Sequence, residues 1–159
     1  MPTGDVNCDS HVYDVGHRSA IGVIGKANLK PRAIPNFVLC SGLALPFKDS
    51  AFDMAYSSHV IEHVSEPFLF LKELIRVSNF RVVVKCPHRY GDRVLFWNSP
   101  DKILHLHFFS KAWFIEAIKK LNCVGTVSYS KFQCLPSELF CLFRFPLEIT
   151  CDIRKNSDV

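Results

Sequence analysis

The chain has 159 residues, of which 48% are hydrophobic and 21% are charged, and its formal net charge is +4. This length fits one domain, taken here as residues 1–159, and the balance of residue types excludes a disordered chain. The lysines and arginines are dispersed, with no basic stripe interleaved with aromatic residues, so we expect no nucleic-acid partner.

The cysteines and the apolar stretches of the chain bear on the cellular compartment and on membrane association. The seven cysteines include no C-x-x-C pair, and most lie in apolar stretches. Reduced thiols and a cytoplasmic location therefore fit better than a zinc ribbon or a secreted disulfide scaffold. Met1–Asp14 lacks the charge and hydropathy pattern of a signal peptide. The most apolar stretch, Leu139–Ile149, is too short to span a bilayer, so we expect a soluble protein without a membrane span.

In chain order, the first predicted strand is Asp5–Asp9, which ends in an acid. Asn36–Cys40 and Ala51–Ser57 are the next two predicted strands. From Glu66 to Ser78 the apolar residues recur with the period of a helix, which predicts a helix directly after a short turn.

The second half of the chain begins with Phe80–Cys86, whose β-branched residues predict a buried strand. Ser110 is the expected N-cap of the helix that follows. Val124–Tyr129 and Leu139–Phe145 are the last predicted strands. Because these two are close in sequence, we expect them to form an antiparallel hairpin at the edge of the sheet.

The alternation of strands and helices in the middle of the chain predicts an α/β fold with a mostly parallel sheet. We expect Asn36–Cys40, Phe52–Ser57 and Phe80–Cys86 to lie together in that sheet. Ligands of such sheets bind at the carboxyl ends of the strands, so the residues at those ends are the candidates for function.

One stretch in the middle third of the chain carries a specific motif, LALPFKDSAFDMAYSSHVIEHVSEPFLFLKELIRV. A Leu-Pro-Phe loop precedes a Phe-Asp strand, a Ser-x-x-x-Glu-His-Val turn and a helix that ends in Arg-Val. This order resembles the core signature of the type-11 class I S-adenosylmethionine (SAM)-dependent methyltransferases, and the resemblance extends over roughly Asp5 to Asn122. It implies a Rossmann-like class I methyltransferase sheet, SAM as the cofactor, and methyl transfer to a small-molecule or metabolite acceptor.

The resemblance also implies a cofactor site. Asp9 matches the acid that binds the SAM ribose, residues 41–43 match the loop that cradles adenine, and residues 57–59 match the strand end beside the methionine moiety. The family's acid at the adenine loop is a serine here, which removes one hydrogen-bond acceptor. The implied cofactor-binding residues are Asp9, Ser41, Gly42, Leu43, Ser57, Ser58 and His59.

The family's fold opens with a strand and a glycine-rich turn, and the few residues before Asp9 leave no room for them. Val12–Gly16 has the apolar-Asp-apolar-Gly order, but it lacks the further glycines and lies too close to Leu45. We therefore expect an N-terminally incomplete domain, with a homodimer partner or another subunit supplying the missing elements. The alternative is a non-catalytic methyltransferase-like scaffold that acts as an interaction module.

His59, Glu62 and His63 are the candidate catalytic residues, because they follow the predicted strand Phe52–Ser57 at the mouth of the expected cofactor cleft. We expect His59 and His63 to share one helix face and Glu62 to point partly away. Either histidine could serve as a base near neutral pH. The competing interpretation is that Glu62 and His63 cap the helix and pack locally.

The same residues spell H-x-x-E-H, the inverted zinc-protease pattern, but they follow a strand instead of lying within a long helix. Some methyltransferases that act on hydroxyl groups hold a divalent metal with Glu-x-x-Glu-His at this turn. Here His59 replaces the first glutamate, which suits a hard cation less well. We expect no metal ligands.

Other aromatic and imidazole residues surround the expected site. His88, His105 and His107 are expected to be structural. A further aromatic group, expected either in the core or around a substrate pocket, comprises Phe96, Trp97, Phe108, Phe109 and Trp113.

Overall fold

The computed structural model describes residues 5–9, 36–89, 105–130 and 148–155. Its helices are α1 (Pro67–Val77) and α3 (Lys111–Lys120). Neither of these helices is long and apolar enough to cross a membrane. The strands are β1 (Asn7–Asp9), β2 (Phe37–Leu39), β3 (Phe52–Ser58), β4 (Ser78–Pro87), β5 (Val124–Ser130) and β6 (Glu148–Arg154).

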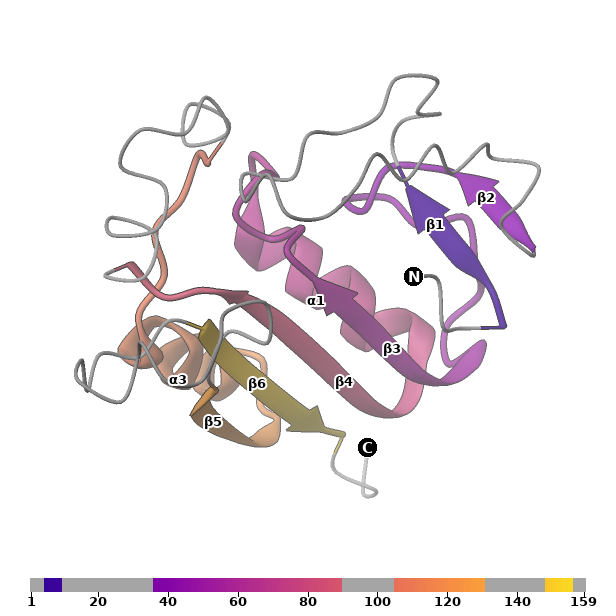
Figure 1. Ribbon diagram of the computed structural model, residues 1–159. Helices are drawn as coiled ribbons and strands as arrows, with labels where there is room; N and C mark the ends of the chain where they lie inside the picture. Colours follow the sequence, from indigo (N-terminus) through magenta and orange to yellow (C-terminus); the bar gives the residue numbers. More distant parts are fainter. Residues whose placement is uncertain (1–4, 10–35, 90–104, 131–147, 156–159) are drawn as a thin grey trace.

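Four of the strands form a mixed sheet in the order β3-β4-β6-β5 (Figure 1). β3 and β4 run parallel, as a strand–helix–strand unit requires, and α1 connects them. β6 runs antiparallel between β4 and β5. The structure thus confirms an α/β fold that carries both parallel and antiparallel strands.

The expectation of a single sheet is wrong in the part of the chain that the structure describes. Asn36–Cys40 contributes β2, which pairs in parallel with β1 in a separate two-stranded sheet, whereas Phe52–Ser57 and Phe80–Cys86 belong to the four-stranded sheet. β3 has a described pairing partner on one edge only, which is β4.

The antiparallel pair at the end of the chain is confirmed for Val124–Tyr129, which lies in β5. Its partner is Glu148–Arg154, and the predicted strand Leu139–Phe145 lies outside the described residues. In β6 every second residue is an almost fully buried apolar one, which is the two-residue period of a strand packed on a core. These residues are Ile149, Cys151 and Ile153.

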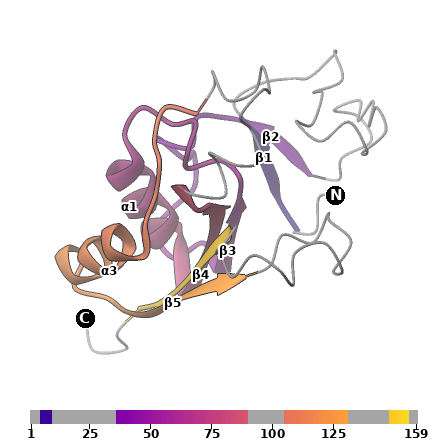
Figure 2. The same cartoon turned by 60° about the vertical axis from the view of Figure 1, so that its left-hand side comes forward.

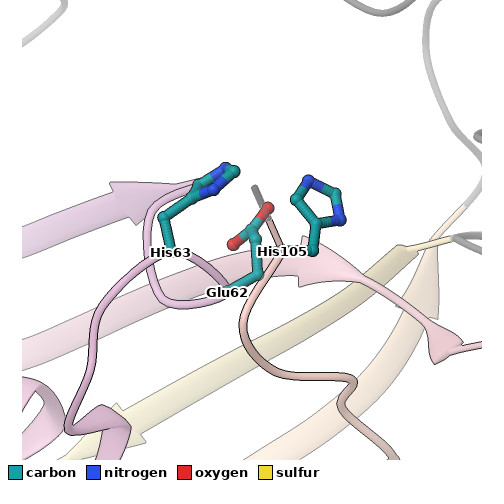
Figure 3. Close-up of side chains that lie close together, drawn as sticks. All are labelled: Glu62, His63 and His105. Atoms are coloured by element: carbon teal, nitrogen blue, oxygen red, sulfur yellow. The ribbon is translucent and has the colours of Figure 1, made fainter. Parts of the chain in front are cut away.

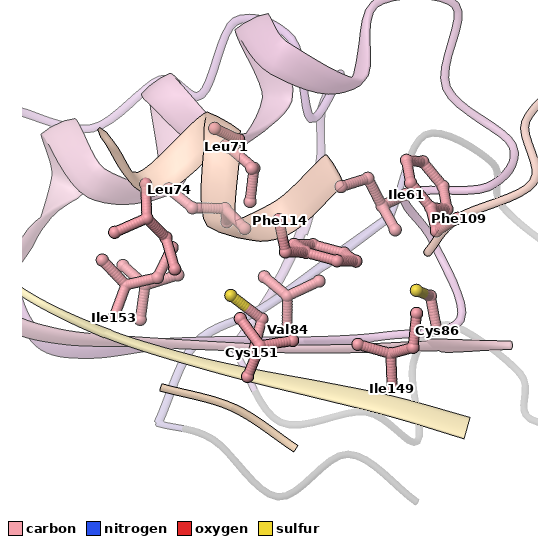
Figure 4. Packing of buried hydrophobic residues seen from close by; sticks show 14 of the residues in the cluster. Ile61, Leu71, Leu74, Val84, Cys86, Phe109, Phe114, Ile149, Cys151 and Ile153 are labelled. Atoms are coloured by element: carbon pink, nitrogen blue, oxygen red, sulfur yellow. The ribbon is translucent and has the colours of Figure 1, made fainter. Parts of the chain in front are cut away.

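The core lies between the four-stranded sheet and the two helices, which cover the same face of the sheet (Figure 2). Leu71 and Leu74 of α1 and Phe114 of α3 meet Val84 of β4 and Cys151 of β6 there (Figure 4). Ser110 caps α3 as expected, because its hydroxyl accepts a hydrogen bond from the Trp113 backbone N–H.

Arg76 near the end of α1 fixes the loop that leads from β2 to β3. Its guanidinium donates hydrogen bonds to the carbonyl oxygens of Leu45 at 2.9 Å and Phe47 at 2.7 Å. It also pairs with the carboxylates of Glu73 and Asp49. Glu73 in turn accepts a hydrogen bond from the Leu45 N–H, and its contact with Arg76 lowers its pKa. The Leu-Pro-Phe part of the motif therefore contacts the Arg-Val part directly, through the Arg76 side chain.

Candidate active site

The ends of β1 and β2 bring the first two groups of predicted cofactor residues together. Asp9 is the last residue of β1, and its carbonyl oxygen accepts a hydrogen bond of 2.9 Å from the N–H of Cys40, directly before the 41–43 loop. The acid and the loop therefore lie at neighbouring carboxyl ends of parallel strands, where α/β sheets bind ligands.

The 41–43 loop is a tight turn. The Ser41 hydroxyl accepts a hydrogen bond from the Leu43 N–H, and the Ser41 carbonyl accepts one from Ala44. A Cβ atom at Gly42 would lie 2.6 Å from the Phe70 ring, so the close approach of the loop to α1 requires glycine. Ser41 is exposed, and its hydroxyl has a second lone pair for another donor.

The third group lies where β3 ends. Ser58 closes the strand, and the His59 N–H donates to the Lys85 carbonyl at 2.9 Å, which continues the pairing with β4. The Ser57 side chain is 6% exposed, and its hydroxyl oxygen has no hydrogen-bond partner in the described residues. A buried hydroxyl without a partner at a strand end is a group that a bound ligand can satisfy.

His59 turns the chain sharply after β3. Its φ of 55° lies in the left-handed region, which histidine enters more readily than most residues do. A turn follows, in which His63 N–H donates to the Val60 carbonyl, and α1 begins only at Pro67. The expectation that His59 and His63 share a helix face is therefore wrong, because residues 59–63 form a turn.

The His59 ring lies between two carboxylates. Its Nε2 is 3.0 Å from Glu148 Oε1, at the start of β6, and its Nδ1 is 3.4 Å from Glu62 Oε1. Burial lowers the His59 pKa, but the contacts with Glu148 and then Glu62 outweigh burial and raise the pKa to about 9. Both ring nitrogens face an acid, and Glu148 is a site residue that the sequence did not indicate.

Glu62 is the most deeply buried acid of the site, with 1% of its surface exposed. It does not point away as expected. Neither carboxylate oxygen has a hydrogen-bond partner in the described residues, and His59 is in ion-pair contact only. The Glu62 carbonyl accepts a hydrogen bond of 2.8 Å from Leu106 N–H, which holds residues 105–107 against the turn.

His63 and His105 meet across this contact. Their rings lie 4.7 Å apart, edge to face, and Figure 3 shows the Glu62 carboxylate beside both imidazoles. His63 is exposed and His105 is half-buried. The sequence predicted a structural role for His105. Its place in a segment expected over the strand ends was the only sequence feature that indicated a position in the site.

A pocket of about 310 Å³ lies beside the start of α1. It contains three members of the aromatic group, Phe108, Phe109 and Trp113, while Phe96 and Trp97 lie outside the described residues. Phe109 is also part of the core, and the use of the pocket as a substrate site stays a prediction. The complete lining comprises Glu66, Pro67, Phe68, His107, Phe108, Phe109 and Trp113.

Parallel strands with an acid and a glycine-containing turn at their ends, together with an antiparallel terminal pair, are compatible with a Rossmann-like α/β fold. Residues 16–79 match the family model described as a methyltransferase domain. An uncharacterized methyltransferase of Mycobacterium leprae is 45% identical over 51 residues, which are 30% of this chain. The match covers 19% of that relative, so the chain corresponds to about a fifth of its length.

Solved structures share the fold at low identity. One belongs to the complex between the Haloferax volcanii Trm112 methyltransferase activator and a methyltransferase, with a TM-score of 0.62 and 12% identity over 77% of this chain and 62% of the other. A SAM-dependent methyltransferase from Thermotoga maritima has a TM-score of 0.62 and 19% identity over 82% of this chain and 69% of the other. The Rossmann-like fold class is thereby confirmed.

Proposed function

We propose that the chain is a SAM-dependent methyltransferase that acts on a small-molecule acceptor. The observation that carries this proposal is the juxtaposition of Asp9 with the 41–43 loop at neighbouring strand ends, within a sequence of the methyltransferase family. The Asp9 carboxylate can accept hydrogen bonds from both ribose hydroxyls. The turn at Ser41, Gly42 and Leu43, of which Ser41 is exposed, offers a surface for the adenine ring.

The remaining cofactor residues are assigned to the methionine end. Ser57, Ser58 and His59 lie where β3 ends, and the unpartnered Ser57 hydroxyl suits a polar ligand there. SAM supplies the methyl group on a sulfonium, whose sulfur leaves easily. The chain's own task is then to hold the acceptor in line with the methyl group, and to take a proton where the acceptor carries one.

Among the three candidate catalytic residues, His63 fits the role of proton acceptor best. Both ring nitrogens of His59 face carboxylates, and Glu62 is buried behind the turn, whereas His63 is exposed. We assign Glu62 and His59 to positioning the turn. In an activity assay, His63→Ala should reduce the rate far more than the melting temperature, and equal losses of both would instead indicate a structural role.

A small, partly apolar acceptor is supported by the aromatic pocket beside the turn. Phe108, Phe109 and Trp113 offer ring surfaces, and His107 and Glu66 offer polar groups at the same pocket. A few polar groups in an aromatic lining are typical of small-molecule sites.

The test of cofactor binding is isothermal titration with SAM and with its demethylated product, in the presence of EDTA. We expect binding that is weaker than that of a complete family member, and at least about tenfold weaker still in Asp9→Ala, because that change removes a charged acceptor. The matched control is Asp5→Ala, which removes a nearby exposed carboxylate. The hydrogen bond that Asp5 accepts from Asn36 uses the backbone carbonyl, so the substitution retains it. If no heat of binding is measured at millimolar SAM, the proposal is refuted. If SAM binds as tightly as it does to a complete family member, the expectation of weaker binding is wrong.

The second candidate is a non-catalytic scaffold that acts as an interaction module. It is favoured by the break between β2-β1 and β3, and one similar fold belongs to a complex with an activator subunit. We propose that a homodimer partner or another subunit completes the sheet at β3. Light scattering that shows a monomer with full SAM affinity would contradict this partner role.

We also propose a cytoplasmic location. The five cysteines that the structure describes are all free thiols, and two of them, Cys86 and Cys151, are buried in the core. Reduced buried thiols are typical of proteins in a reducing compartment.

A further inference from the structure

Three metal-ligand side chains from two segments meet at the turn after β3. Glu62 and His63 follow one another in the turn, and His105 precedes Leu106, whose N–H donates a hydrogen bond to the Glu62 carbonyl. One potential ligand atom of each residue lies within 4.8 Å of those of the other two (Figure 3). The arrangement brings two imidazoles and one carboxylate to a single point.

The second observation is that the Glu62 carboxylate is buried and lacks hydrogen-bond partners among the described residues. This carboxylate is 1% exposed, and neither of its oxygens has a hydrogen-bond partner in the described residues. A buried ionised carboxylate is costly unless a charge or several donors compensate it. His59 at 3.4 Å offers ion-pair compensation to Oε1. A cation between Glu62 and the two imidazoles would compensate the carboxylate directly.

We propose that Glu62, His63 and His105 bind one divalent transition-metal ion, and that Zn²⁺ is the ion that fits this set best. Imidazole nitrogen and carboxylate oxygen are zinc ligands, whereas Mg²⁺ and Ca²⁺ require mainly oxygen. Three protein ligands leave a fourth position for water, as in catalytic zinc sites. The site differs from a Glu-x-x-Glu-His site, because His59 lies outside the ligand set and His105 comes from a distant segment.

The geometry allows the three groups to close around an ion. Zinc–ligand bonds of about 2.1 Å in a tetrahedron place ligand atoms roughly 3.4 Å apart. The ligand atoms lie within 4.8 Å of one another, so closure needs only small side-chain rotations. His63 is exposed and His105 is half-buried, which leaves both rings room to rotate. His59, whose other ring nitrogen contacts Glu148, then holds the Glu62 carboxylate from behind, as outer partners of metal ligands commonly do.

This site goes beyond methyl transfer, since metal binding requires no SAM. It also changes the role of His63, which would be a metal ligand when zinc is present and a proton acceptor only in its absence. Zinc titrations without SAM and SAM titrations in EDTA therefore test the two proposals separately.

The experiment is titration of the chelator-stripped full chain with ZnCl₂ at pH 7.5, with a phosphine reductant that keeps the cysteines as thiols. We expect one zinc per chain in the wild type. His63→Ala and His105→Ala should each weaken binding by at least about tenfold, because each removes a direct ligand. The matched control is His107→Ala, a nearby imidazole outside the ligand set, which should leave zinc affinity unchanged. Titration with Mg²⁺ should give no binding.

Co²⁺ as a spectroscopic probe separates this site from adventitious binding by cysteine. Imidazole and carboxylate ligands give only visible d–d bands, whereas thiolate ligands add an intense near-ultraviolet charge-transfer band. A thiolate band, or zinc binding that survives both histidine substitutions, would overturn the proposal.

Glu62→Gln gives a third readout that a merely structural role would not produce. The substitution removes the carboxylate ligand and also the ion pair with His59, so the melting temperature of each protein is compared with that of its own metal-free form. The rise in melting temperature that zinc causes in the wild type should disappear in the variant. A zinc-dependent rise that persists in Glu62→Gln would remove Glu62 from the ligand set.

Discussion

His59 is held by carboxylates from two distant parts of the chain, Glu62 in the adjoining turn and Glu148 at the start of β6. The hydrogen bond to Glu148 is the largest of the effects that raise the His59 pKa to about 9 against the cost of burial. We predict that Glu148→Gln lowers this pKa toward the ordinary value near 6.5. An NMR titration of the histidine ring protons in EDTA measures it, with His59→Gln to assign the resonance.

The same contact predicts how stability depends on pH. The folded-state pKa of His59 is raised, so its stabilisation is complete below pH 6.5 and is lost as the pH rises through about 9. The free energy of unfolding should therefore fall over this range in the wild type and change less in Glu148→Gln. About a third of the His59 side chain is exposed, so solvent screening reduces the effect. Identical pH profiles for the two proteins would contradict this assignment.

The residue types at this turn could be predicted from the motif, but their arrangement could not. H-x-x-E-H after a strand indicated that His59, Glu62 and His63 lie at a strand end, because the strand and the motif are local patterns. The left-handed φ of His59, the burial of Glu62 and the meeting with His105 all depend on contacts across the fold. The sequence pattern predicted His59 and His63 on one helix face, whereas the chain forms a turn there and α1 begins at Pro67.

Among the elements, the link between α1 and the loop before β3 depends on Arg76. Its planar guanidinium reaches two carbonyls and two carboxylates at once, and the ammonium of a lysine cannot reproduce that set. We predict that Arg76→Ala lowers the melting temperature clearly and that Arg76→Lys recovers only part of the loss. Thermal unfolding followed by circular dichroism measures this.

Arg81→Ala is the control for this prediction. Arg81 also makes two hydrogen bonds to a carboxylate, that of Asp152, but it bonds no loop carbonyl. Exposed ion pairs of this kind contribute little to stability, so the control should lose less than Arg76→Ala. Equal losses would show that Arg76 acts only as one partner of an ion pair.

Sequence patterns predicted those elements whose signals are local. α1, α3, β3, β4 and β5 have clear periodicity or a cap, and all were placed within a few residues of their observed bounds. The strand β6 was not predicted, although the alternation in EITCDIR marks a strand that buries only one of its two faces. The predicted strand Leu139–Phe145 lies outside the described residues.

At the scale of the whole molecule, the two sheets show what local patterns cannot reveal. β1 and β2 have three residues each, and which strands pair is decided by contacts that no short window contains. The exposed Met54 and Tyr56 lie on β3, the strand next to the break. The sequence pattern placed Asn36–Cys40 in the same sheet as the other two strands, and the separate pairing of β1 with β2 shows that this was wrong for the described residues.

The last prediction tests the strand order of the four-stranded sheet through its two buried thiols. Cys86 on β4 and Cys151 on β6 are fully buried, and burial raises the pKa of both, that of Cys151 to about 12. A thiolate is the reactive species, so both should resist iodoacetamide at pH 8 in the native protein and become reactive together as urea unfolds the chain. Cys40, half-buried outside this sheet, is the reference. Mass mapping of labelled peptides measures each rate, and early labelling of Cys151 alone would show that β6 is not held between β4 and β5.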